Sequence, residues 1–388
     1  MSRKRSGCVK GHVVIVGLGN IGSFTAGLVA RLPGVSRVTL IDRDVYEAGN
    51  VAGQDIAGRD AVGRPKTSVQ AARIRRINPR LPVLAIRDHL ENIPLGLLRA
   101  DCILGCLDSK RARQVLSEMA WRMSAGAYVD AGVQADGLLA RVSVWIPGPD
   151  GACLECGWSD REYAALEQAY PCVPDMSIPS PTGAPACLGA LAASLQVLEC
   201  RKVLSGEYEP GAGGREIILE AAGHRAYVLA HERNRECRFD HVRLGSPKTV
   251  RLACIIGDVV SPARGGGALR MADGRSFLTR LVCRKCGRGR RLLRLQGRLR
   301  PGDRRCSRCG GALVPLGFEV REYLDMKVLP RRDPRRTLRA VGMMPGDVFT
   351  VRGAGGETVC EVEGGGRDLE DCCSVSGCAR PSCARRRL

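Results

Sequence analysis

The sequence predicts an α/β protein in which a mostly parallel sheet is followed by a small β-rich C-terminal region. Three observations support this fold class. Apolar strands alternate with helical segments over residues 12–241, which is typical of parallel strands joined by crossover helices. A glycine-rich turn follows the first strand directly. Beyond the alternating region the chain becomes rich in Gly and Arg and carries two Cys-x-x-Cys pairs.

The expected elements follow one another along the chain. The run "HVVIV" (12–16) predicts a buried strand, and the helix after the glycine turn is expected from about Ile21 to Arg31. The segment "KTSVQAARIRRINP" predicts a helix that ends near Pro79, because proline cannot continue it. The segment "ARQVLSEMAWRMSAG" predicts a helix closed by Gly126. The remaining expected elements are strands in "RVTLID", "LPVLAI", "DCILGCLD", "YVDAGV" and "LLARVSVWI", a helix over Cys187–Leu204, and a hairpin of "REIILE" and "AYVLAH".

Length and composition suggest how the chain is organised. Its 388 residues are enough for two or three domains. We expect a basic arm (1–11), the α/β domain (12–241), the cysteine-bearing β-rich region (242–363) and a disordered tail (364–388). No apolar run reaches the ~18 residues of a membrane span, and the first residues lack a signal-peptide core. We therefore expect a cytoplasmic protein with no membrane segment.

The positive charge is concentrated in the C-terminal third. Residues 1–241 contain 29 Lys and Arg against 26 Asp and Glu, whereas residues 242–388 contain 31 against 14. The excess is either an ordinary solvated surface or a surface for an acidic partner or nucleic acid. Aromatic residues make up only 4% of the chain, which argues against extensive stacking on bases.

The glycine-rich turn has the pattern of a nucleotide site. Gly17, Gly19 and Gly22 lie between a predicted strand and a predicted helix, where glycine allows a tight turn and a phosphate close to the helix N-terminus. Asp42, at the end of the second strand, is placed to bind ribose hydroxyls. These features predict a Rossmann-like fold, and they fit NAD enzymes, flavoproteins and nucleotidyl transferases alike.

The next stretch separates these classes. The segment "LIDRDVYEAGNVAGQDIAGRDAVGRPKT", with "GCLDSKRAR" further on, resembles the ubiquitin-activating superfamily of adenylyltransferases, which includes the ThiF, MoeB and HesA types. A dehydrogenase does not need these additional polar residues, whereas an enzyme that cleaves ATP needs cations and a carboxylate for a metal. The residues that match the superfamily pattern are Asp42, Asp44, Glu47, Asn50, Gln54, Gly63, Lys66 and Asp108, the last followed by Arg111 and Arg113.

The resemblance implies a role for each group of matched residues. Asp42 would bind the ribose of ATP, Asn50 and Lys66 would contact its phosphates, and Asp108 would hold Mg²⁺. The implied catalytic residues are Asp108, Lys66 and Arg113, and the implied cofactor-binding residues are Gly17, Gly19, Gly22, Asp42, Asp44, Asn50, Gln54 and Lys66.

Gly53 departs from the superfamily pattern. The superfamily has an Arg at this position, which contacts the triphosphate, often across a dimer. Arg59 and Arg64 are the nearby candidates to replace it.

Two groups of cysteines have the spacing of zinc ligands. Cys283-x-x-Cys286 and Cys306-x-x-Cys309 predict a zinc ribbon, which in a segment so small and polar would not fold without its metal. By resemblance, Cys153-x-x-Cys156 begins a second zinc site in the α/β domain, and Cys237 with His241 closes it. Both sites are expected to be structural.

Many members of the superfamily pass the activated carboxylate to one of their own cysteines as a thioester. The usual place of that cysteine, counted back from the matching Gln196 and Glu199, falls near Pro179, which is not a cysteine. Cys172 lies on the preceding loop, and Cys187 begins the next helix, where the helix dipole favours a thiolate. Three alternatives stay open: Cys172, Cys187 or no thioester cysteine.

The resemblance covers about residues 10–241 and implies a homodimer that adenylates the C-terminal carboxylate of a ubiquitin-like or sulfur-carrier protein ending in Gly. The implied cofactors are ATP, Mg²⁺ and two Zn²⁺. A second hypothesis is a member of the superfamily that activates a carboxylate on tRNA, which the basic C-terminal third would suit. A third is a non-catalytic scaffold that binds a ubiquitin-like protein or nucleic acid, and a dehydrogenase ranks fourth.

Overall fold

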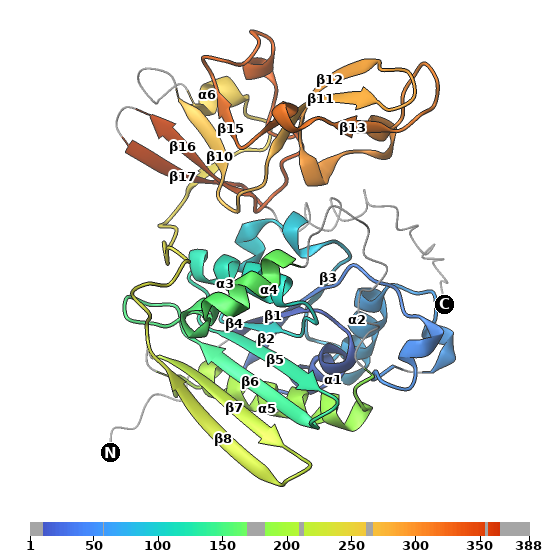
Figure 1. Ribbon diagram of the computed structural model, residues 1–388, viewed down its shortest axis with the longest axis vertical. Helices are drawn as coiled ribbons and strands as arrows, with labels where there is room; N and C mark the ends of the chain where they lie inside the picture. Colours follow the sequence, from blue (N-terminus) through green and yellow to red (C-terminus); the bar gives the residue numbers. More distant parts are fainter. Residues whose placement is uncertain are drawn as a thin grey trace, which may run out of the picture. The chain divides into compact units, whose positions relative to one another are not determined.

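The computed structural model describes residues 11–56, 58–168, 183–208, 213–260, 267–353 and 356–364 (Figure 1). The chain divides into two units. One comprises Met1–Ile93 and Leu97–Leu244, and the other comprises Pro94–Gly96 and Gly245–Leu388. The first unit contains the glycine-rich turn and the superfamily motifs, and the second contains the ribbon cysteines.

The first unit is built on an eight-stranded sheet in the order β3-β2-β1-β4-β5-β6-β7-β8. The strands from β3 to β5 are parallel, and the last three add antiparallel neighbours. The expected mostly parallel α/β sheet is confirmed. The strands are β1 (Gly11–Val16), β2 (Val35–Ile41), β3 (Val83–Ile86), β4 (Cys102–Gly105), β5 (Tyr128–Gln134), β6 (Leu139–Trp145), β7 (Gly214–Glu220) and β8 (Arg225–His231).

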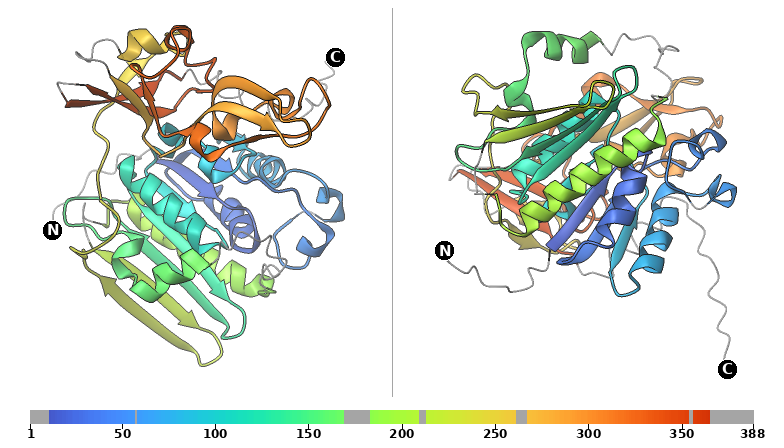
Figure 2. Two further views of the ribbon diagram at one scale, coloured as in Figure 1. Left: turned by 45° about the horizontal axis from the view of Figure 1, so that its top comes forward. Right: turned by 90° about the horizontal axis from the view of Figure 1, so that it is seen from below.

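Helices cover both faces of this sheet. Figure 2 shows α1, α2 and α5 together on one face, while α3 and α4 lie on the other (Figure 1). Within the described residues, no helix has the length and apolar character needed to cross a bilayer. The helices are α1 (Asn20–Val29), α2 (Lys66–Ile77), α3 (Lys110–Arg122), α4 (Asp160–Gln168) and α5 (Ala186–Leu204).

The main core lies between the sheet and α1, α2 and α5. Val13 and Ile15 from β1 are fully buried, and Ala192 and Ala193 let α5 approach the strands closely. Each buried side chain of Val or Ile size contributes roughly 1.5–3 kcal/mol relative to exposure. α5 buries one side against the sheet, while Ser194, Leu198 and Arg201 on its other side are exposed.

One predicted helix boundary is wrong. The helix "ARQVLSEMAWRMSAG" was expected to be closed by Gly126, but α3 ends at Arg122. Ser124 adopts the left-handed conformation, with φ of 51°, and Gly126 already leads into β5. A serine therefore makes the turn that the sequence assigned to glycine. The helix α4 was not expected at all, because nine residues of mixed polarity give a weak periodic signal.

The second unit contains two sheets and the short helix α6 (Ile256–Val260). A five-stranded sheet has the order β15-β10-β16-β17-β9, and a smaller sheet places β11 between β12 and β13, with β14 also paired to β11. The strands are β9 (Lys248–Val250), β10 (Ala268–Met271), β11 (Phe277–Cys283), β12 (Gly289–Leu295), β13 (Leu313–Pro315), β14 (Val320–Arg321), β15 (Tyr323–Asp325), β16 (Val348–Gly353) and β17 (Gly356–Val362).

The Pro-Gly-Asp turn before β16 has a structural role in the second unit. Asp347 is fully buried, and its Oδ1 accepts a hydrogen bond from Arg275 Nη2 at 2.6 Å. Arg275 Nε also donates to Asp273 Oδ2 at 2.8 Å, so the buried guanidinium lies between two carboxylates. This cluster joins the segment after β10 to the start of β16. Burial of its charges is tolerated because they are paired.

Candidate nucleotide site and cysteine clusters

The glycine-rich turn brings three backbone segments into contact. Gly17 has φ of +86°, and a Cβ there would lie 2.5 Å from the carbonyl oxygen of Cys106. A Cβ on Gly22 would lie 1.9 Å from the carbonyl oxygen of Gly17. A Cβ on Gly19, by contrast, would meet nothing within 4 Å. Gly17 and Gly22 are therefore required by packing, while the space beside Gly19, at the N-terminus of α1, is open to a ligand.

The turn lies where the order of the parallel strands reverses. β1 is flanked by β2 on one side and β4 on the other, so the connections leave in opposite directions at the ends of β1 and β4. Ligands in open α/β sheets bind in the crevice at such a switch point. The amide of Cys106 donates to Val16 O at 2.8 Å, which places the segment after β4 beside the glycine-rich turn.

Asp42 connects the end of β2 to the same turn. Its Oδ2 accepts a hydrogen bond from the Leu18 amide at 2.6 Å, and its Oδ1 accepts one from the Asp44 amide at 2.7 Å. Burial raises the pKa of the Asp42 carboxyl. Each carboxylate oxygen has a second lone pair, so both can still accept a bond from a ribose hydroxyl.

The loop after β2 carries the next matched residues. Lys66 begins α2 and is only 7% exposed, and its Nζ lies 3.5 Å from Asp44 Oδ2. Asn50 Oδ1 accepts a hydrogen bond from the Glu47 amide at 3.0 Å, so these two residues cap the single turn Ala48–Asn50. Lys66 thus pairs with Asp44, and its positive charge opposes the burial that raises the pKa of Asp42.

Gly53 lies at the end of this loop and does not need to be glycine. Its φ is not positive, and a Cβ there would make ordinary contacts, 3.7 Å from Asn20 Nδ2 and 3.9 Å from Ala184 O. Its carbonyl accepts a hydrogen bond from Asn20 Nδ2 at 2.6 Å. The buried Gln54 Oε1 and Asn20 Oδ1 have no hydrogen-bond partner within the described part of the chain. Asn20, which joins the turn to this loop, was not among the expected site residues.

Asp108 follows β4 and is exposed. Among the described residues its carboxylate makes no hydrogen bond or ion pair. Ser109, directly after it, caps α3 by accepting the Ala112 amide at 3.3 Å. Asp108 therefore has a defined backbone position and a carboxylate that is free to bind a cation.

Arg113 is held by a buried carboxylate on β5. Its Nη1 donates to Asp130 Oδ2, and Asp130 is fully buried. Arg141 Nη2 lies 3.2 Å from the same oxygen, and the hydroxyl of Tyr128 donates to Asp130 Oδ1 at 2.9 Å. The structure therefore places the guanidinium of Arg113 in an ion cluster with β5 and β6, a partnership that the sequence did not indicate.

Gln196 and Glu199 are both buried on α5. Gln196 Nε2 donates to the carbonyl oxygens of Gly105 and Val129 at 3.0 and 2.9 Å. Its Oε1 accepts from the Cys106 thiol at 3.3 Å, and burial raises the pKa of that thiol to about 12. Gln196 thus ties α5 to the ends of β4 and β5, and Cys106 is not a nucleophile at neutral pH.

The structure describes one of the two candidate thioester cysteines. Cys187 is exposed in the first turn of α5. Cys172, together with Pro179, lies outside the described residues.

The structure brings Cys153, Cys156, Cys237 and His241 together, with ligand atoms within 4.8 Å of one another. Cys153 Sγ lies 3.8 Å from both Cys156 Sγ and Cys237 Sγ, and Cys156 Sγ lies 3.4 Å from His241 Nε2. Tetrahedral zinc thiolates are separated by roughly 3.8 Å. His241 Nδ1 lies 2.7 Å from the Phe239 carbonyl, so Nε2 faces the thiols. The donor set fits a structural zinc ion.

The four cysteines of the expected ribbon also converge. The Sγ atoms of Cys283 and Cys309 are 3.5 Å apart, and those of Cys286 and Cys306 are 3.7 Å apart. All four ligand atoms lie within 4.8 Å of one another. The pairs follow β11 and precede β13, so each lies on a short turn at one end of the small sheet. Four converging cysteine sulfurs fit a structural zinc ion.

Comparison with known proteins agrees with the superfamily resemblance. The model of the ThiF family matches residues 6–239. The chain is 28% identical over 228 residues to molybdopterin-synthase adenylyltransferase of Escherichia coli (strain K12), covering 58% of this chain and 85% of that protein. It is 26% identical over 220 residues to sulfur carrier protein ThiS adenylyltransferase of the same organism, covering 56% and 82%.

Two further similarities are more limited. The chain is 43% identical to tRNA threonylcarbamoyladenosine dehydratase of Escherichia coli (strain K12), but over only 108 residues, 27% of this chain and 40% of that protein. Among solved structures, E. coli MccB with succinimide has a TM-score of 0.49 and 21% identity, covering 59% of this chain and 66% of that chain. Residues 242–388 lie outside the family match.

The number of bound zinc ions tests both cysteine clusters. We expect purified protein to contain two zinc ions per chain by mass spectrometry of the metals, because both clusters have tetrahedral donor sets. Cys286→Ser should retain one zinc ion and lose the fold of the small sheet, which a metal-free ribbon cannot keep. Cys254→Ser is the matched control, since Cys254 belongs to the same unit but to neither cluster. Two zinc ions in Cys286→Ser would contradict the assignment.

Proposed function

The chain belongs to the ThiF family, and we propose that it is an ATP-dependent adenylyltransferase acting on the C-terminal carboxylate of a ubiquitin-like or sulfur-carrier protein. One observation carries the proposal. At the strand ends where the sheet order reverses, the glycine-rich turn contacts Asp42 and the segment that leads to Asp108, and Lys66 is joined to the same loop through Asp44. The names of two adenylyltransferase relatives support the same reaction.

The proposed reaction is a displacement at phosphorus. A carboxylate oxygen of the protein tail attacks the α-phosphorus of ATP, the bond to the bridging oxygen breaks, and pyrophosphate leaves with the electron pair. The product is an acyl-adenylate. Because the carboxylate is already ionised, no base is needed, and the enzyme acts by positioning the reactants and stabilising the negative charge.

The residues at the strand ends supply that positioning. The open space beside Gly19 and the free amides of α1 accept phosphate oxygens. Asp42 accepts the ribose hydroxyls, and the ammonium of Lys66 lies next to the departing pyrophosphate. The unpaired carboxylate of Asp108 would hold Mg²⁺, which neutralises charge on the phosphates when bound.

We propose that the enzyme works as a homodimer, as the superfamily resemblance implies. Arg59 and Arg64 are both exposed on the loop between Asn50 and α2, and either can supply the guanidinium that Gly53 does not. We further propose that the zinc ion at Cys153, Cys156, Cys237 and His241 staples the end of the adenylation domain. Its closed donor set leaves no position for a substrate.

The acyl group then passes to a sulfur or amine acceptor. Cys187 is exposed and begins α5, so it can accept the acyl group as a thioester, with AMP as the leaving group. Cys172 and direct transfer to an external acceptor remain the other two routes.

A second candidate function is activation of a carboxylate on tRNA, and one observation favours it. Residues 284–308, which include both turns of the ribbon, contain eleven Arg and Lys and a single acid, Asp303. Such a density of positive charge attracts a phosphate backbone and makes binding salt-dependent. Arg290 and Arg294 lie 2.9 and 3.7 Å from Asp303, the single acid of this stretch. The similarity to tRNA threonylcarbamoyladenosine dehydratase over 108 residues also favours this second function.

Pyrophosphate exchange distinguishes these functions. With ATP, labelled pyrophosphate and a panel of small proteins ending in Gly, we expect exchange that requires one of the proteins. Asp108→Ala should lower the exchange rate at least about hundredfold, because it removes charge stabilisation at the phosphates. Asp136→Ala is the matched control, an exposed carboxylate on the turn after β5. Exchange that depends on tRNA instead would favour the second function, and ATP binding without exchange would favour a scaffold.

Restoring the superfamily residue at Gly53 gives a second test. Gly53→Arg should raise the exchange rate about tenfold or more, because a guanidinium would be added beside the triphosphate and the backbone can accept a side chain. Gly53→Gln controls for the added volume without the charge. An equal or lower rate in Gly53→Arg than in the wild type would show that another residue already supplies this cation.

A further inference from the structure

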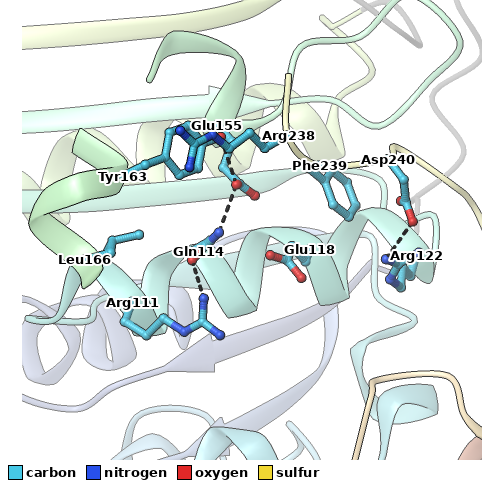
Figure 3. Close-up of a pocket in the computed structure, with 10 residues that line it drawn as sticks. All are labelled: Arg111, Gln114, Glu118, Arg122, Glu155, Tyr163, Leu166, Arg238, Phe239 and Asp240. Carbon is cyan, nitrogen blue, oxygen red and sulfur yellow. Dashed lines mark hydrogen bonds and ion pairs between the residues drawn. The ribbon is translucent and has the colours of Figure 1, made fainter. Parts of the chain in front are cut away.

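A pocket of about 590 Å³ lies between α3, α4 and the loop that carries Cys237 and His241 (Figure 3). Residues spaced three or four apart along α3 form one wall, which is therefore a single helix face. The α3 residues are Arg111, Gln114, Glu118 and Arg122, and the other lining residues are Glu155, Tyr163, Leu166, Arg238, Phe239 and Asp240. The adenylation residues do not line it.

Two of the three arginines in the pocket already have acidic partners. Arg122 Nη2 lies 3.1 Å from Asp240 Oδ2, and its guanidinium lies over the Phe239 ring. Arg238 pairs with Asp160 at 2.9 Å and lies 4.1 Å from the centroid of the Tyr163 ring. Arg111 Nη1 donates to the side chain of Gln114 at 2.6 Å. These cations are thus oriented by their own contacts on the rim.

The two glutamates of the pocket, by contrast, form no ion pair with a described residue. Glu155 is 2% exposed, and its Oε2 accepts hydrogen bonds from Gln114 Nε2 at 2.8 Å and Tyr163 OH at 3.0 Å. Its Oε1 is buried with no partner in the described structure. Glu118 makes no hydrogen bond or ion pair with a described residue. Burial, together with the charge of Glu155, raises the pKa of Glu118 to about 7, although the positive charges of Arg122 and Arg111 act in the opposite direction.

We propose that this pocket binds the ammonium or guanidinium group of a basic side chain from a protein partner. A buried carboxylate oxygen without a partner is unfavourable, and a cationic donor placed between Glu118 and Glu155 would satisfy both carboxylates. Figure 3 shows these carboxyl groups on the same stretch of the pocket, above α3. The phenyl and phenol rings and Leu166 provide apolar contact for the methylene stem of the side chain.

Size and accessibility indicate which cation fits. The volume exceeds what a metal ion needs and lies in the range of pockets for organic groups. Arg111, Arg238 and Asp240 on the rim are exposed, so the pocket is open to solvent. An open pocket suits a side chain that projects from the surface of a partner better than an enclosed metabolite.

The position of the pocket relates it to the adenylation site. Arg111 follows Asp108 by three residues and lies in the first turn of α3. A protein whose C-terminus reaches Asp108 would therefore have its body near this face of α3. That the partner is the adenylated protein rests on the proposed function. That the pocket binds a basic side chain does not depend on it.

Ligand-observed NMR on the full-length protein tests the inference with N-acetyl-lysine methylamide as the probe. We expect saturable binding of this probe and none of N-acetyl-norleucine methylamide, which has a similar stem and no charge. Glu118→Gln should weaken binding about tenfold, because it removes one charged partner of the ammonium. This variant should fold, since it removes a carboxylate whose ionised form is disfavoured by burial.

Glu232→Gln is the matched control, an exposed glutamate after β8 with the same change of charge, and it should bind the probe as the wild type does. Glu155→Gln provides a second variant in which the amide can still accept from Gln114 and Tyr163. Equal binding of the norleucine probe, no saturable binding of the lysine probe, or unchanged affinity in both Glu118→Gln and Glu155→Gln would overturn the proposal. Exchange activity is not the readout, so failure of the adenylation proposal would be seen separately.

Discussion

The close approach of the backbone at the ends of β1 and β4 is the constraint on which the site depends. The segment after β4 passes so near Gly17 that no side chain fits there, and Gly22 lies against the Gly17 carbonyl in the same way. Gln196 holds the arrangement from the side of α5 by bonding to the last residue of β4. Because the two strand ends touch, the open N-terminus of α1 and the free carboxylate of Asp108 border the same crevice.

The polar residues of the site divide into those that hold the crevice and those that remain available. Asp42 does both, since its oxygens bind the amides of Leu18 and Asp44 and retain lone pairs. Lys66 is buried with its ammonium 3.5 Å from the Asp44 carboxylate, whereas Asp108 is exposed and makes no hydrogen bond or ion pair with a described residue. Arg113 forms an ion pair with the buried Asp130 of β5. Rigid neighbours around a few unsatisfied charges are what electrostatic catalysis requires.

The sequence predicted the features that local pattern determines. The strand–turn–helix at Gly17, the mostly parallel sheet and the four ribbon cysteines were predicted, because glycine, apolar periodicity and ligand spacing each leave a local signal. The grouping of Cys153 with Cys237, which lie 84 residues apart, came from the superfamily resemblance. The left-handed turn at Ser124 after α3, the ion cluster around Asp130 and the unpaired Oε1 of Glu155 were not predicted. Each depends on which side chains meet across the fold, and periodicity contains no such information.

A crystal structure of the protein with Mg²⁺ and a non-hydrolysable ATP analogue tests the central claim most directly. The account predicts the triphosphate beside Gly19 at the start of α1, the ribose on Asp42, and the metal on Asp108 with Lys66 at the phosphates. A nucleotide bound elsewhere, or bound at the glycine-rich turn with Asp108 remote from the metal, would contradict the claim that the strand ends of β1 and β4 form an adenylation site.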